Sequence, residues 1–294
     1  MADIDSIYEG QIWRPPSEAY SLILQATVGC SWNRCTFCMA YRDKTFRIKS
    51  QSEIRRDVET VLPAYRDVER IFLADGNALL IPTDDLVSIL ELLYSSFPKL
   101  KRVTLYGGPQ DIRDKTHDEL IRLRDAGLGM VYLGLESGSR KVLKKVRKGA
   151  GPEMMVRAGQ KMKRVGIPLS AIVILGLGGQ ELSREHAEQT GKVLTRMQPA
   201  YIGCLTLMIY KGCEIEKEQN EGRLTLLEPH QVFDELEIMV ENLLFSDETV
   251  FRANHASNYQ PLRATLPAQK DRLLEKIRSL RESGQFKPEF MRAL

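Results

Sequence analysis

The sequence is poor in cysteine and histidine, and it contains no long run of apolar residues. Its five cysteines, an odd number, do not suit a disulfide framework. No stretch reaches the roughly 18 consecutive apolar residues that a membrane helix needs. The first twenty residues lack the basic start and the apolar segment of a secretory signal. We therefore expect a cytoplasmic protein in which some cysteines bind a metal or take part in a reaction.

The sequence also has no large excess of basic over acidic residues, or of acidic over basic ones. The 42 Lys and Arg residues nearly balance the 39 Asp and Glu residues, which gives a formal net charge of +3. A charge this small does not imply a polyanionic partner. The hydrophobic fraction of 43% and the charged fraction of 28% are those of an ordinary globular protein, and 294 residues can form one large α/β domain.

Short apolar segments alternate with amphipathic helices from residue 20 to residue 245, without a linker. This alternation predicts a parallel sheet with both faces covered. Six strand-helix units suggest a partial barrel, although a doubly wound open sheet would give the same local pattern. The predicted strands are 20–27, 70–74, 102–106, 130–136, 169–176 and 201–210.

Short sequence patterns also mark where several helices are expected to begin. Thr116 and Glu119 have the spacing of a capping box, and Pro152 and Pro229 suit first helical turns. We expect an N-terminal extension over 1–19, the α/β unit over 20–245, and a C-terminal part over 246–294. That last part is predicted to be an irregular polar segment followed by a helix over 267–283.

Three cysteines lie within nine positions, in the segment GCSWNRCTFC, directly after the first predicted strand. In parallel α/β folds, functional groups gather at the carboxyl ends of strands, where Cys30, Cys35 and Cys38 would lie. A structural zinc site needs four ligands, and the first histidine is only His117. A [4Fe–4S] cluster held by three thiolates instead leaves one iron with an open coordination position.

This segment resembles the cluster-binding loop of the radical S-adenosylmethionine (SAM) family, and the resemblance covers roughly residues 20–245. It implies a partial (β/α)6 barrel in which Cys30, Cys35 and Cys38 hold a [4Fe–4S] cluster. S-adenosylmethionine would bind the fourth iron and be cleaved to a 5′-deoxyadenosyl radical. The spacing Cys-x4-Cys-x2-Cys is one residue longer in its first gap than the common family pattern, and a loop can absorb such a change.

The resemblance also implies contacts with S-adenosylmethionine, chiefly in the branch of oxygen-independent coproporphyrinogen oxidases and Elongator-type enzymes. The residues concerned follow successive strands. Phe37 and Gly176 would lie near the adenine, Gly76 and Asn77 near the methionine amino group, Glu136 near the ribose or methionine, and Lys148 near the methionine carboxylate.

Simpler interpretations exist for three of these positions. Phe37 could pack within its loop, and Asp75 with Asn77 could form an Asx-type turn. Lys148 could be one cation of a solvated basic run over 140–148.

The substrate-binding residues are the least defined. Tyr106 is followed by two glycines, which permit close approach of a ligand. The polar segment FRANHASN contributes Arg252, Asn254, His255 and Asn258, and His255 could act as an acid or base near neutral pH. Many exposed loops are polar without a binding role, so this set stays a hypothesis.

The sequence thus favours a radical SAM enzyme that acts on a small molecule and receives an electron from a donor such as flavodoxin or ferredoxin. The alternatives are a noncatalytic haem or tetrapyrrole carrier on the same fold, an RNA-modifying member of the family, and a zinc protein. A basic patch over 140–148 could meet phosphates. We do not favour a nucleic acid, because no RNA-binding module is recognisable.

Overall fold

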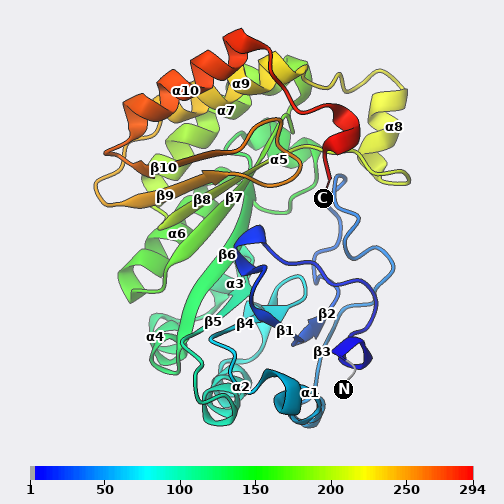
Figure 1. Ribbon diagram of the computed structural model, residues 1–294, viewed down its shortest axis with the longest axis vertical. Helices are drawn as coiled ribbons and strands as arrows, with labels where there is room; N and C mark the ends of the chain where they lie inside the picture. Colours follow the sequence, from blue (N-terminus) through cyan, green and yellow to red (C-terminus); the bar gives the residue numbers. More distant parts are fainter. Residues whose placement is uncertain (1–3, 294) are drawn as a thin grey trace. The chain divides into compact units, whose positions relative to one another are not determined.

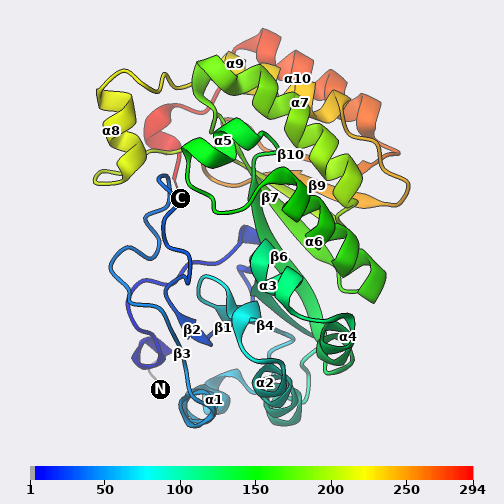
Figure 2. The same cartoon turned by 180° about the vertical axis from the view of Figure 1, so that it is seen from behind.

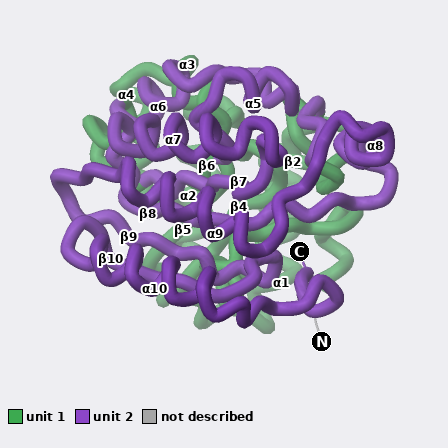
Figure 3. The backbone as a smooth tube through the Cα atoms, turned by 90° about the horizontal axis from the view of Figure 1, so that it is seen from above, with its two compact units in different colours: residues 1–33, 38–133, 161–168 green, residues 34–37, 134–160, 169–294 purple. Residues whose placement is uncertain are grey.

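The computed structural model describes residues 4–293, and the chain divides into two compact units (Figure 3). The first unit comprises residues 1–33, 38–133 and 161–168, and the second comprises residues 34–37, 134–160 and 169–294. The strand β6 (Leu128–Glu136) and the helix α6 (Pro152–Val165) each contribute residues to both units.

The first unit is built on parallel strands. β1 (Leu22–Gln25) pairs with β4 (Arg70–Ala74), β4 pairs with β5 (Arg102–Tyr106), and β5 pairs with β6, all in parallel. The helices are α1 (Gln51–Tyr65), α2 (Thr83–Ser96), α3 (Pro109–Asp114) and α4 (His117–Asp125). α1 and α2 lie side by side (Figure 2). Four of the five residues of β4 are buried, as expected for a strand covered on both faces.

Short elements frame the cysteine loop and the N-terminal segment of this unit. β2 (Thr27–Val28) and β3 (Arg47–Ile48) form a small antiparallel pair on either side of the loop. Single 3₁₀ turns occur at η1 (Ile4–Ile7), η2 (Pro16–Glu18) and η3 (Ala78–Leu80). The predicted capping box is confirmed, because the Thr116 side chain accepts from the Glu119 N–H and the Glu119 side chain accepts from the Thr116 N–H.

The second unit contains β7 (Leu169–Leu175) and β8 (Tyr201–Thr206), which pair in parallel. Its helices are α5 (Arg140–Lys145), α7 (Gly179–Met197), α8 (Glu214–Asn220), α9 (Pro229–Glu241) and α10 (Lys270–Ser283), with a 3₁₀ turn at η4 (Glu289–Met291). α7, α9 and α10 pack in succession, and α9 and α10 run side by side (Figure 1).

The expectation of an irregular segment after residue 249 is wrong. β9 (Thr249–Ala253) pairs in parallel with β8, and β10 (Leu262–Leu266) pairs with β9 in an antiparallel hairpin. Both strands alternate between buried and more exposed residues, with the arginines outward and Phe251 and Ala264 inward. In the sequence, the polar loop between the two strands made this alternation of buried and exposed residues difficult to recognise.

The six predicted strands and the helices expected near residues 117, 152, 229 and 267 are all present. Two short helices, α3 and α8, were not expected. α7 begins at Gly179, which takes a left-handed conformation (φ +64°) that a side chain would disfavour. Within residues 4–293 no helix is both long enough and apolar enough to cross a membrane.

Candidate cofactor site

The five cysteines fall into two classes. Cys30, Cys35 and Cys38 are partly exposed, whereas Cys204 in β8 and Cys213 before α8 are buried. Burial raises the pKa of the Cys204 thiol well above its ordinary value. The buried Cys213 thiol donates to the Tyr210 carbonyl at 2.8 Å. Only the three loop cysteines therefore combine solvent access with a shared segment.

Cys30 and Cys38 belong to the first unit and Cys35 to the second. Among the residues that the structure describes, no three His, Cys, Asp or Glu side chains converge closely enough to hold a metal ion. The case for a cluster here consequently depends on the chemistry of the thiols and on how their loop is held.

The loop around Cys30 is held from both sides by the turn after β4. The Asp75 carboxylate accepts the backbone N–H of Gly29 at 3.1 Å, and the Asn77 side-chain oxygen accepts the N–H of Ser31 at 3.2 Å. The two residues that flank Cys30 are thus fixed by side chains 46 positions away. The alternative of a purely local Asx-type turn is wrong for these two residues.

Asp75 is itself buried and strongly engaged. The oxygen that binds Gly29 also accepts from the Gln25 amide at 2.9 Å and from the Lys44 ammonium at 2.8 Å. The side chains of Asp75 and Lys44 are 0% and 4% exposed, so this ion pair lies almost entirely out of water. Asn77 is anchored in the same way, because its amide donates to Asp111 and to the Ser31 hydroxyl.

Gly76 lies directly against the first cysteine. Its N–H donates to the Gly29 carbonyl at 3.1 Å. A Cβ added at Gly76 would lie 2.6 Å from the Cys30 Cβ and 2.8 Å from its Cα, closer than atoms can approach. A glycine at this position thus allows the turn after β4 to approach the cysteine loop closely.

The segment that carries Cys35 is held within the second unit. The Thr36 N–H donates to the Val146 carbonyl at the end of α5, and the Thr36 carbonyl accepts from the Ile215 N–H in α8, both at 3.1 Å. The unexpected helix α8 thus helps to fix the residue next to Cys35. Phe37 follows Thr36 and is partly exposed.

Two predicted cofactor residues, Glu136 and Lys148, contact each other. The Lys148 ammonium donates to the Glu136 carboxylate at 2.8 Å. Glu136 ends β6 with a φ of +60°, the left-handed region that a residue with a side chain rarely adopts. Such conformations persist where the surroundings enforce them and cluster at functional sites. Lys148 is therefore not simply one cation of a solvated run.

Gly176, at the end of β7, contacts a buried network that the sequence did not predict. Its N–H donates to the Glu235 carboxylate at 2.6 Å, and the other Glu235 oxygen accepts from Ser183 at 2.6 Å. His186 lies 3.6 Å from Glu235, and its Nδ1 is 2.7 Å from the Ser137 hydroxyl. The network thus joins the residue after Glu136 to the turn that contains Gly176.

Burial decides the protonation of this network. It raises the pKa of Glu235 to about 7 and lowers the pKa of His186 to about 4, since both side chains lie out of water. Between these values both groups are uncharged. The sequence offered a signal for this buried carboxyl group, because Glu235 lies on the same face of α9 as the buried Val232, Leu236 and Met239.

Two of the predicted substrate residues have structural partners. The Asn258 side chain is buried and bonds to the Thr206 hydroxyl and the Cys204 carbonyl, both at 2.8 Å, which ties the β9–β10 loop to β8. The His255 Nδ1 accepts from the Ser257 N–H at 3.1 Å. Burial, with the nearby Lys287, lowers the pKa of His255.

The other three predicted substrate residues are more accessible. Tyr106, at the end of β5, is partly exposed and packs edge-on against Phe72, with ring centroids 5.0 Å apart. Arg252 and Asn254 are exposed, on β9 and just after it. Arg252 also lines a groove beside α10.

Comparison with solved structures places this fold among known proteins. Coproporphyrinogen III oxidase (HemN) from Escherichia coli, described as a radical SAM enzyme, is 17% identical with a TM-score of 0.56, over 75% of this chain and 51% of that one. Methylornithine synthase (PylB) is 16% identical with a TM-score of 0.54, over 82% and 66%. The radical SAM methyltransferase TsrM from Kitasatospora setae is 17% identical with a TM-score of 0.55, over 74% and 44%. At these identities the likeness shows the fold, that of the radical SAM partial barrel.

The chain thus spans between 44% and 66% of the length of these three proteins. A search of curated protein sequences found no match. The sequence profile of the radical SAM superfamily, however, matches residues 24–190, more than half of the chain. The chain therefore belongs to the radical SAM superfamily, whose enzymes use a [4Fe–4S] cluster and S-adenosylmethionine.

Proposed function

We propose that this enzyme cleaves S-adenosylmethionine reductively and that the resulting 5′-deoxyadenosyl radical abstracts hydrogen from a small-molecule substrate. Cys30, Cys35 and Cys38 would hold the cluster through their thiolates. When bound, the cluster supplies the electron that breaks a carbon–sulfur bond of S-adenosylmethionine and yields a 5′-deoxyadenosyl radical.

The donor set suits such a cluster. Thiolates are the usual ligands of iron–sulfur clusters, and three of them leave one coordination position for a second ligand. The observation that carries the proposal is the clamp on Cys30, in which Asp75 and Asn77 fix the backbone on both sides of the cysteine. A loop held by two buried side chains presents its thiol in a defined direction, which a surface cysteine would not need.

The remaining residues suit recognition of a zwitterionic cosubstrate. An ammonium has three donors, so Lys148 can keep Glu136 as a partner and still bind a carboxylate. Glu136 can accept hydrogen bonds from hydroxyl or amino groups. Gly176 carries no side chain, and its N–H is held by Glu235, so the turn after β7 is both open and rigid.

We infer a small substrate because the sequence shows no recognisable RNA-binding module. Asn258 and His255 bond within their own loop region, and Tyr106 packs among aromatic rings. An electron donor of the flavodoxin or ferredoxin type would complete the reaction.

The test is formation of 5′-deoxyadenosine by anaerobically reconstituted protein supplied with S-adenosylmethionine and dithionite. We expect the product from wild type and from Cys204→Ala, which removes a buried thiol outside the loop. We expect Cys35→Ala to form at least about a hundredfold less, since loss of one thiolate removes the ordered cluster. Equal yields from Cys35→Ala and Cys204→Ala would overturn the proposal.

A further inference from the structure

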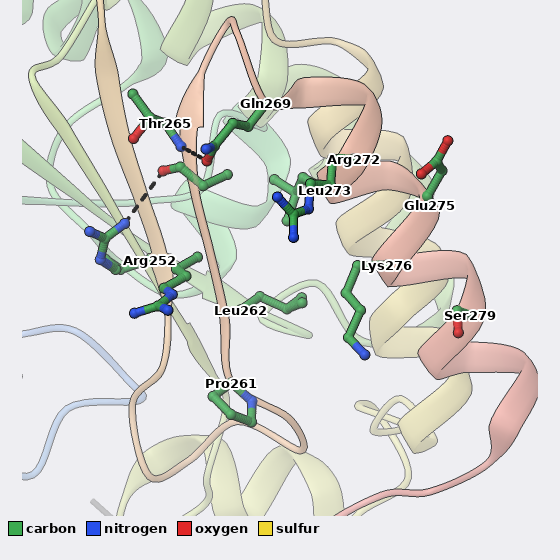
Figure 4. Close-up of a pocket in the computed structure, with 12 residues that line it drawn as sticks. Arg252, Pro261, Leu262, Thr265, Gln269, Arg272, Leu273, Glu275, Lys276 and Ser279 are labelled. Carbon is green, nitrogen blue, oxygen red and sulfur yellow. Dashed lines mark hydrogen bonds between the residues drawn. The ribbon is translucent and has the colours of Figure 1, made fainter.

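A groove lies between the β9–β10 hairpin and α10, far along the chain from the cysteine loop (Figure 4). It has a volume of about 790 Å³. Its floor contains the apolar residues Leu262, Ala264 and Leu273, which belong to the core of the second unit. Its walls are polar, and the charged groups on them are mainly cations.

The four cations come from the hairpin and from α10. Arg252 and Arg263 are directly paired across the hairpin, so their side chains project together from its exposed face, and Figure 4 shows Arg252 on the side of the strands away from α10. Arg272 and Lys276 are one turn apart on α10, and both lie on the side of the helix that faces the strands (Figure 4). The acidic lining residue Glu275 is directed away from the strands in the same view.

The neighbouring arginines of α10 are paired, in contrast to those of the groove. Arg278 contacts Glu237 and Glu241, and Arg281 contacts Asp234 and Glu237, all from α9. Among residues 4–293, none of the four groove cations forms an ion pair. α10 therefore uses one face to neutralise its charge against α9 and keeps unneutralised charge on the other.

Further donors complete the groove. Arg252 is oriented by the carbonyls of Phe251 at 2.8 Å and Ala264 at 3.4 Å. The Gln269 oxygen accepts from the Thr265 N–H at 2.8 Å, so its amide hydrogens remain for a ligand. The Ser279 hydroxyl also lines the groove.

We propose that this groove binds a ligand that carries two or more phosphate groups. Arginine forks match phosphate oxygens, and four cations along one groove, with those on α10 about 5–6 Å apart at Cβ, suit successive phosphates better than one anion. Among residues 4–293, no aromatic side chain lines the groove, so this part of the chain offers no surface there on which bases would stack. Recognition thus falls on the phosphates, which either a free polyphosphate or a single nucleic-acid strand could supply. The proposal is independent of the reaction at the cysteine loop.

The experiment uses the full chain and two probes, inorganic tripolyphosphate followed by calorimetry and a fluorescent single-stranded oligouridylate followed by anisotropy. We compare wild type with the double variant Arg272→Ala/Lys276→Ala. The control is Arg55→Ala/Arg56→Ala, which removes two exposed cations from α1. Circular dichroism and thermal unfolding verify that both variants fold.

We expect the groove variant to bind at least tenfold more weakly and the control to change less than twofold. If the groove variant binds only tripolyphosphate more weakly, the ligand is a free polyphosphate. If the strand shows it as well, we expect the slope of log affinity against log salt to fall by about 1.4 in magnitude, the value for two phosphate contacts on a single strand. The proposal is overturned if neither probe binds, or if both variants weaken binding equally.

Discussion

Lys148 and Glu136 form an ion pair of 2.8 Å in which the side chains are only 16% and 10% exposed. The pair joins the end of β6 to the segment after α5, and Glu136 is held there in a left-handed conformation. Both charges are largely removed from water, and the ion pair compensates the charge of Glu136. Each of the two residues was predicted to contact the cosubstrate. Because they form an ion pair, a substitution at one changes the surroundings of the other.

We expect Lys148→Met to lower the free energy of unfolding by about 3 kcal/mol, because it leaves Glu136 buried without its partner. We also expect the affinity for S-adenosylmethionine to fall at least about tenfold, since the carboxylate of the ligand loses a cation. Urea unfolding and calorimetric titration measure the two effects.

The double variant Glu136→Gln/Lys148→Met separates these roles. It should regain most of the stability, because no unpaired charge remains, but it should not regain affinity. Lys141→Met serves as the control, since Lys141 is 70% exposed in the same basic run. Full affinity in the double variant would show that neither residue contacts the cosubstrate.

Gly76→Ala tests the close approach of the β4 turn to the cysteine loop. The added methyl group would lie 2.6 Å from the Cys30 Cβ and 2.9 Å from the Gly29 carbonyl oxygen, so the loop must shift. We expect the variant to incorporate less than half of the wild-type iron on reconstitution. Gly203→Ala in β8 is the matched control, since nothing lies within 4 Å of its added Cβ. Equal iron contents in the two variants would contradict this role of Gly76.

Glu235→Gln tests the buried network through the pH dependence of stability. The pKa of Glu235 is about 7 in the folded protein, above its ordinary value of 4.5. Between these pH values the native state therefore binds more protons than the unfolded state, so the protein loses stability as the pH rises from 4.5 to 7. His186 acts in the opposite sense, because its pKa falls from 6.5 to about 4 and stability rises with pH between these values. In wild type the two slopes partly cancel.

The Gln variant retains only the contribution of His186. Its free energy of unfolding relative to wild type should therefore increase between pH 4.5 and pH 7, by about 3 kcal/mol in all. Denaturant unfolding at pH 5, 6, 7 and 8 measures this difference, with Glu241→Gln on the same helix as the control. A difference that stays constant with pH would mean that the Glu235 carboxyl does not titrate in this window.

The strands and helices were predictable where the pattern is local. RIFLA and RVTLY are short, largely apolar segments, and both form strands over the expected residues. The β9–β10 hairpin was not predicted, because Arg252 and Arg263 interrupt its apolar residues and a polar loop separates the strands. Read with a period of two, Phe251 and Ala253 together with Leu262, Ala264 and Leu266 would have indicated it.

The cysteine loop could be predicted because its chemistry is contained in ten consecutive residues. The groups that hold it could not be, since Asp75 and Asn77 reach it across 46 positions of sequence. The same holds for the pairing of Ser137, His186 and Glu235, which come from three separate segments. Only the tertiary structure brings such side chains together, although a carboxylate on the apolar face of α9 was a usable signal.

The central claim is that Cys30, Cys35 and Cys38 hold one [4Fe–4S] cluster, and Mössbauer spectroscopy with iron analysis of anaerobically reconstituted protein tests it most directly. We expect about four irons per chain in wild type and in Cys204→Ala, and we expect Cys30→Ala, Cys35→Ala and Cys38→Ala each to lose the cluster spectrum. A wild-type protein with fewer than about three irons, or any one of the three loop variants with an unchanged spectrum, would contradict the account.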